Sequence, residues 1–123
     1  MRYITVLKGT PPAGPPPESL MAAIMDLGAQ AAASGALLDN AGLAPSAAGA
    51  QVSVTAGELS VTDGPFTEAK EYISYAVYEV RSKAEAVEWA SRFMAVHAQH
   101  WPGWEGECDV VKIMGPEDFT QPH

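Results

Sequence analysis

Apolar and polar residues alternate strictly along residues 51–62. A period of two is typical of a β-strand, and the Ala56-Gly57 pair at the centre is typical of a two-residue hairpin turn. A turn at this pair places four apolar side chains on one face, in two cross-strand pairs: Val52 with Val61, and Val54 with Leu59. The pattern therefore predicts a β-hairpin with one apolar face.

Three further segments, 3–8, 72–80 and 108–114, have the β-branched and aromatic content of strands. Residues 36–50 are less regular. They predict a second strand broken by Asn40 and Gly42, followed by a turn over residues 45–49.

Two helices are predicted between these strands. The first begins at Pro17 and fades near Gly35, and it carries an apolar stripe at helical spacing: Leu20, Ile24, Leu27 and Ala31. The second begins at a capping box, with Ser82 as N-cap and Glu85 three residues on, and it ends at Pro102-Gly103. Its apolar stripe consists of Ala86, Ala90, Phe93 and His97.

The order strand, helix, strand and hairpin, strand, helix, strand predicts one α+β domain over residues 1–123. The strand at 72–80 is apolar at both parities, whereas a strand covered on one face only alternates. We therefore expect helices on one face of an antiparallel sheet and a second subunit's sheet on the other, which makes the protein a homodimer.

Composition narrows the classes of function. The formal net charge is −8 and the seven Lys and Arg residues are scattered, which argues against a nucleic-acid surface. Cys108 is the single cysteine, so an internal disulfide is excluded. The N-terminus lacks signal-peptide architecture, and polar residues and glycines interrupt the Ala-rich stretch 20–38, which argues against a membrane span. We expect a soluble, cytoplasmic protein with no cofactor.

Asp63 is the first candidate for chemistry, because it shares the strand parity of the apolar face and precedes the Gly64-Pro65 turn. In one interpretation its carboxylate accepts backbone N–H groups within the turn. In the other it faces a cleft and acts as an acid or base. We also expect Gly64 to hold a backbone conformation that a β-carbon disfavours, so that Gly64→Val destabilises the fold.

His97 is the second catalytic candidate, as a partner for Asp63, although a lone His on an apolar stripe is more often a hydrogen-bonded core residue. His100, three residues on, shares its face, but two histidines alone do not make a metal site, and we expect no metal. Three aromatic residues are candidates for ligand binding: Phe66, Trp101 and Trp104. Each has the alternative of packing its own loop. Glu68, Lys70 and Glu71 are interpreted as a solvated run.

The segment Asp63-Gly64-Pro65-Phe66, followed by Glu68, Lys70 and Glu71, resembles the DGPF signature of the YciI-related (YCII/DGPF-domain) family. Further matches lie at residues 1–4, 86–90, 100–107 and 115–119. The resemblance implies a ferredoxin-like domain of the dimeric α/β-barrel type. One departure matters: the YciI branch is associated with a His in the first helix that works with an Asp, and this chain has no His before His97.

Two classes of function remain. One is a dimeric small-molecule-binding domain with a cleft near Asp63. A further version of this hypothesis makes the domain an acid–base enzyme of unknown substrate. The alternative is a non-catalytic regulatory or interaction module, which the resemblance links to extracytoplasmic-function sigma factors. A pocket lined by Asp63 and His97 favours the first class, and a conspicuous apolar outer patch favours the second.

Overall fold

The computed structural model describes residues 1–10, 14–67 and 70–120, so Glu68 and part of the proline-rich loop lie outside the described residues. The elements follow one another as β1 (Arg2–Gly9), α1 (Glu18–Ala33), β2 (Leu37–Gly42), the short 3-10 helix η1 (Ser46–Ala48), β3 (Ala50–Thr55), β4 (Glu58–Asp63), β5 (Glu71–Glu79), α2 (Lys83–His100), β6 (Gly106–Ile113) and α3 (Pro116–Thr120).

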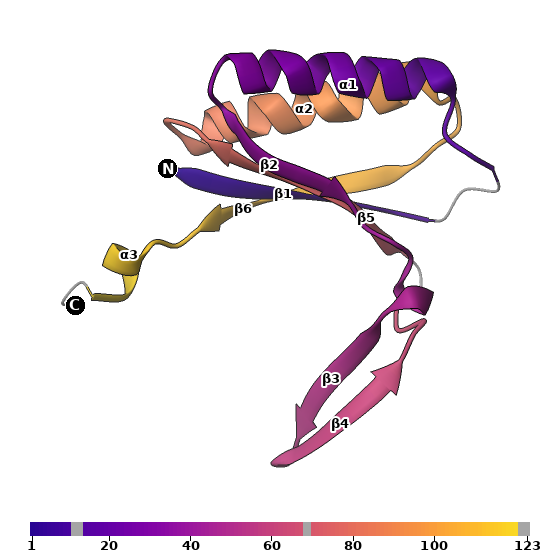
Figure 1. The fold of residues 1–123 in the computed structure, drawn as a ribbon, viewed down its shortest axis with the longest axis vertical. Helices are drawn as coiled ribbons and strands as arrows, with labels where there is room; N and C mark the ends of the chain where they lie inside the picture. The colour runs from indigo at the N-terminus through magenta and orange to yellow at the C-terminus, as the bar shows by residue number, and fades with distance from the viewer. Residues whose placement is uncertain (11–13, 68–69, 121–123) are drawn as a thin grey trace.

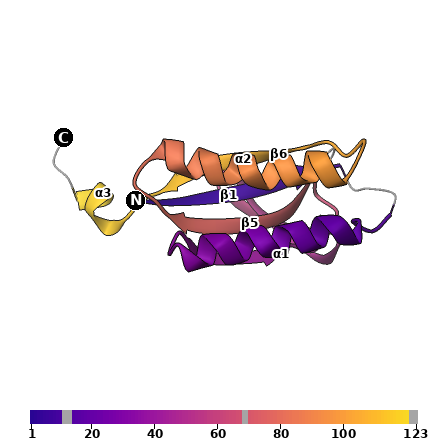
Figure 2. The same ribbon diagram turned by 90° about the horizontal axis from the view of Figure 1, so that it is seen from above.

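Four strands form an antiparallel sheet in the order β2-β5-β1-β6, and β3 and β4 form a separate hairpin. The two long helices, α1 and α2, lie side by side on one face of the four-stranded sheet (Figures 1 and 2). This order of two interleaved strand–helix–strand units is the ferredoxin-like α+β fold, which confirms the prediction.

The C-terminal end of α1 has a local cause in the sequence. Gly35 has a φ of +81°, a value that favours glycine, and it follows the last turn of the helix. Its N–H donates to the carbonyl of Ala32, and the N–H of Ala36 donates to that of Ala31, both at 3.0 Å. Two end carbonyls are thereby satisfied. At the other end, Pro17 is the N-cap rather than the first helical residue.

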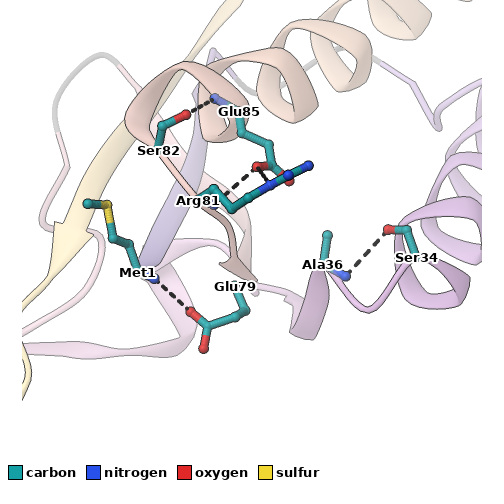
Figure 3. Close-up of polar contacts among 7 residues, drawn as sticks. All are labelled: Met1, Ser34, Ala36, Glu79, Arg81, Ser82 and Glu85. Atoms are coloured by element: carbon teal, nitrogen blue, oxygen red, sulfur yellow. Dashed lines mark hydrogen bonds and ion pairs between the residues drawn. The ribbon is translucent and has the colours of Figure 1, made fainter.

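The start of α2 confirms the predicted cap. The Ser82 hydroxyl accepts the N–H of Glu85 at 3.2 Å, while the Glu85 carboxylate accepts the N–H of Arg81 at 3.1 Å (Figure 3). In a regular capping box the glutamate returns to the N-cap residue itself. Here it reaches one residue further back, so two N–H groups at the helix entrance are still paired.

The second strand is more continuous than the sequence predicts. Asn40 does not break β2, because it pairs with Ala76 of β5; the irregularity lies instead between Leu37 and Asp39. β5 is also paired with β1, and pairing with β5 keeps Asn40 in a strand despite the low strand propensity of Asn. β2 and β5 stay paired to the point where the Leu43 N–H donates to the Ile73 carbonyl at 2.8 Å.

The hairpin formed by β3 and β4 has the predicted register, including Val52 opposite Val61 and Val54 opposite Leu59. Ala56 and Gly57 have φ values of 51° and 80°, as a two-residue turn of this hand requires. The hairpin projects away from the layered body (Figure 1). Its apolar side chains are left 66–74% exposed: Val52, Val54, Leu59 and Val61.

The core lies between the sheet and the helices. Its buried residues include Tyr3, Tyr78 and Ala86, and the rings of Tyr78 and Trp89 stack with their centroids 6.2 Å apart. On the opposite face of the sheet, Ile4 lies between Val77 and Val111 in the strand register. Among the described residues no helix covers that face (Figure 1).

Candidate functional site: a cavity beneath α1

A cavity of about 640 Å³ lies between α1 and the sheet. This volume is within the range of small-molecule sites. One wall is the inward stripe of α1, and the facing wall is built from β2, β5 and the end of β1. Aromatic residues of α2 and of the loop after it close one end. The cavity is therefore surrounded by elements from both halves of the chain.

The space exists because the facing side chains are small. Gly28 and Ala31 lie on the cavity side of α1, and Ser74 and Ala76 lie opposite on β5. A close-packed interior requires complementary volumes, and these residues supply too little. An added β-carbon at Gly28 meets nothing within 4 Å. The Ala-rich composition of α1 is the feature of the sequence that corresponds to this opening.

Four rings form the aromatic end of the cavity, and consecutive rings contact one another. The His97 ring lies edge-on to Phe93 with centroids 4.7 Å apart, and tilted to Trp104 at 4.8 Å. Trp104 in turn stacks on Trp101 at 6.1 Å, with 15° between the ring planes. Of the five residues proposed from sequence for the site, the structure brings three together here: His97, Trp101 and Trp104.

His97 is the most informative group in this cluster. It is 4% exposed, and its Nδ1 lies 2.8 Å from the carbonyl oxygen of Phe93. A carbonyl only accepts hydrogen bonds, so Nδ1 must carry the proton and the Nε2 lone pair is free in the neutral ring. Burial lowers the pKa of His97 below its ordinary 6.5, partly opposed by the bond to Phe93. A neutral imidazole with an acceptor nitrogen therefore lines the cavity.

Glu71, interpreted from sequence as part of a solvated run, is instead an anchor. Its carboxylate accepts the N–H and the hydroxyl of Ser46, both at 2.8 Å, and the hydroxyl of Thr67. These three bonds lower its pKa, the Thr67 contribution being the largest. Glu71 also lines the cavity, so this cluster ties the base of the hairpin to the cavity wall. Lys70 of the same run is exposed and pairs with Glu107 at 3.0 Å.

Asp63 and Phe66 are located outside the cavity. Asp63 is exposed at the end of β4, and neither residue is among the described residues that line the space. Within the described part of the chain no hydrogen bond to the Asp63 carboxylate is found, which does not fit the predicted turn-capping role. Phe66 is half-buried at the base of the hairpin, where its N–H donates to the Ser46 hydroxyl at 3.3 Å.

The predicted reason for Gly64 is wrong, although its requirement for glycine stands. Its φ is not positive; a β-carbon would instead lie 1.6 Å from the Ser46 carbonyl oxygen. The Gly64 N–H also donates to the carbonyl of Gly49 at 2.9 Å. The glycine is needed because two loops cross there. The peptide bond that follows it, Gly64-Pro65, is cis.

Several residues at the site could not be recognised from the sequence pattern. The roles of Ser46 and Thr67 depend on the contacts of Ser46 across long sequence separations, with Thr67 and with Glu71. Thr5, buried on β1, also lines the cavity. The single cysteine, Cys108, is half-buried, and burial raises the pKa of its thiol. An unreactive thiol is the expected consequence.

Comparison with known proteins yields one family. The family model described as the YCII-related domain matches residues 1–103, a span that contains β1 to α2 and every lining residue of the cavity except Trp104. No match is found among curated proteins. In the described residues, moreover, no helix has the length and apolar character needed to cross a membrane.

Proposed function

Since the chain belongs to the YCII-related family, we propose that it is a small-molecule-binding protein whose ligand occupies the cavity beneath α1. The single observation that carries the proposal is the combination of an open, mostly apolar space with a buried His97 whose Nε2 lone pair is free. A few convergent polar groups in an apolar cavity are the common form of a ligand site.

The acid–base form of this proposal makes His97 the proton acceptor. A neutral imidazole can take a proton at Nε2 while Nδ1 stays bound to the Phe93 carbonyl. Asp63 of the same chain lies outside the cavity. In this form of the proposal, the Asp63 that acts with His97 therefore has to come from a second subunit.

A homodimer in the cytoplasm is the setting that we propose. Two uncovered apolar surfaces support the dimer: the open sheet face around Val111, which is 52% exposed, and the hairpin face around Leu59, which is 74% exposed. Apolar surface of this kind is stabilised by burial against a partner.

A regulatory or interaction module is the alternative function, and the hairpin favours it. Its apolar face is a conspicuous outer patch, and a projecting two-stranded element is suited to contact another protein. A sigma factor is the partner class that the family resemblance suggests. The cavity is the observation that ranks ligand binding first.

A matched pair of α1 variants tests ligand binding. Gly28→Leu places a large side chain in the cavity, whereas Ala29→Leu adds one on the exposed side of the same helix. A library of small neutral and charged ring compounds is screened by thermal shift against the wild type and both variants.

We expect compounds that raise the Tm of the wild type and of Ala29→Leu but not of Gly28→Leu. Compounds that stabilise all three proteins equally, or a library without any stabilising compound, would contradict binding in the cavity.

A further inference from the structure

We infer that the ligand of this cavity is an uncharged, flat ring compound that donates one hydrogen bond, from an N–H or O–H group, to Nε2 of His97. This inference rests on the proposed function and names the chemical class of the ligand. Three independent properties of the cavity wall lead to it: the fixed tautomer of His97, the arrangement of the rings, and the distribution of charge.

The tautomer determines the direction of the hydrogen bond. Because Nδ1 donates to the Phe93 carbonyl, Nε2 of the neutral ring is an acceptor only. Among the described residues no donor reaches Nε2, although His97 is 96% buried. A ligand that fills the cavity but offers only acceptors, such as an ether or a ketone, would cover this nitrogen and leave it unpaired, which is unfavourable. A ligand with a donor satisfies it.

The rings determine the shape of the ligand. Trp101 and Trp104 both line the cavity and lie nearly parallel, and His97 is tilted against Trp104. Aromatic walls of this kind favour flat ring systems, which pack against them face-on or edge-on. Most of the lining on α1 is aliphatic, including Leu20, Ile24 and Leu27, so an apolar ligand body matches this wall of the cavity.

The charges determine that the ligand is neutral. No Lys or Arg occurs among the described lining residues, so an anionic ligand would lose its hydration without a counter-charge. Of the lining residues that the structure describes, Glu71 alone carries a carboxylate, and its oxygens already accept hydrogen bonds from Ser46 and Thr67. An anion is therefore repelled, and a cation would have to share the Glu71 carboxylate with the three donors from which it already accepts, which makes a neutral ligand the better match.

Four compounds with the same ring test the inference: indole, 1-methylindole, indole-3-acetate and tryptamine. At neutral pH they are a neutral donor, a neutral compound without a donor, an anion and a cation. Dissociation constants are measured by isothermal titration calorimetry with the full chain, and Gly28→Leu and Ala29→Leu establish that binding occurs in the cavity.

We expect the wild type to bind indole about fivefold or more tightly than 1-methylindole, as a net hydrogen bond predicts, and more tightly than either charged compound. In His97→Phe the preference for indole over 1-methylindole should fall to about one, because the acceptor is gone. His100→Phe, on the same helix but outside the cavity lining, should keep the preference.

A second measurement does not depend on a variant. In ¹⁵N-labelled wild-type protein, indole should shift the unprotonated Nε2 resonance of His97, whereas 1-methylindole should leave it in place. Equal affinities for indole and 1-methylindole, or tighter binding of indole-3-acetate or tryptamine, would overturn the inference and leave binding in the cavity intact. Failure of all four compounds to bind would count against both.

Discussion

One carboxylate oxygen of Glu71 accepts both the backbone N–H and the hydroxyl of Ser46, each at 2.8 Å. The two residues are 25 positions apart in sequence, and the whole β3–β4 hairpin lies between them. The contact holds the two ends of that segment together at the edge of the cavity. Glu71 thus stabilises both the base of the hairpin and one wall of the candidate site.

Glu71→Gln should lower the Tm at neutral pH, because an amide cannot accept all three hydrogen bonds of the carboxylate. The folded-state pKa of Glu71 lies below its ordinary 4.5, so its contribution is present above 4.5 and is lost as the pH falls through the folded value. The Tm difference between wild type and variant should therefore shrink in acid. Thermal unfolding from about pH 3 to 7 measures it.

The exposed Glu58 of the hairpin provides the control for removing one negative charge from an acidic chain. A loss of Tm in Glu58→Gln as large as that in Glu71→Gln would show that the Ser46 contact contributes nothing.

Gly64→Ala should destabilise the fold by about 1–3 kcal/mol, the range for forcing extra volume into a packed site. The added β-carbon would overlap the Ser46 carbonyl oxygen, so one of the two loops must move. Gly49→Ala is the matched variant in the same region. Its β-carbon would make only ordinary contacts at 3.7 Å, and its φ is −121°. Denaturant unfolding compares them; similar free energies of unfolding would refute the steric explanation.

His97 should make the folded state less stable as the pH falls below 6.5, its ordinary pKa. Burial lowers the folded-state pKa, so between the two values the unfolded chain binds a proton that the folded chain does not, and stability rises with pH. His97→Gln should reduce this slope between about pH 5 and 6.5. The free energy of unfolding across this interval gives both slopes, and an unchanged slope in the variant would contradict a buried neutral imidazole.

Asp63→Asn should change the free energy of unfolding by less than about 0.5 kcal/mol, as is usual for an exposed side chain without described partners. Denaturant unfolding measures this change, and the affinity of any cavity ligand is measured in parallel. A selective loss of ligand affinity would support the catalytic role predicted for Asp63. A large loss of stability would instead revive the interpretation of its carboxylate as a cap of the turn.

A homodimer should be observed at micromolar concentration by size-exclusion chromatography with light scattering. Val111→Lys would place a charge on the open sheet face and should shift the population toward monomer. Lys83→Glu, at the exposed start of α2, serves as the surface control. A wild-type protein that is a stable folded monomer would eliminate the dimer.

The features predictable from the sequence are those with local causes. The register around Ala56-Gly57 follows from a turn and a period of two, and the structure reproduces it. The Ser82 cap and the helix end at Gly35 depend on neighbouring residues, and they were also predicted. Hydrogen bonding of His97 was the more common interpretation of its position on an apolar stripe, and its bond to Phe93 confirms it.

The features that were missed depend on distant partners. Asn40 remains in a strand because β5 lies beside it, and Glu71 is anchored by a loop 25 residues earlier. The cavity is a deficit of volume between α1 and β5, and a deficit can be seen only after both elements are packed. For the same reason, strand parity could place Asp63 on the apolar side of its hairpin but could not reveal that this side lies open.

The pairing of Leu43 with Ile73 has a consequence for how this chain can change. It closes β2 and β5 together before the polypeptide departs for the hairpin, so the pairing of the main sheet does not depend on what lies between. The segment is in effect a modular insertion between two adjacent strands. The hairpin beyond the Ser46–Glu71 contact could therefore change in length and sequence, or be exchanged for another recognition element, while the layered body and its cavity keep their architecture.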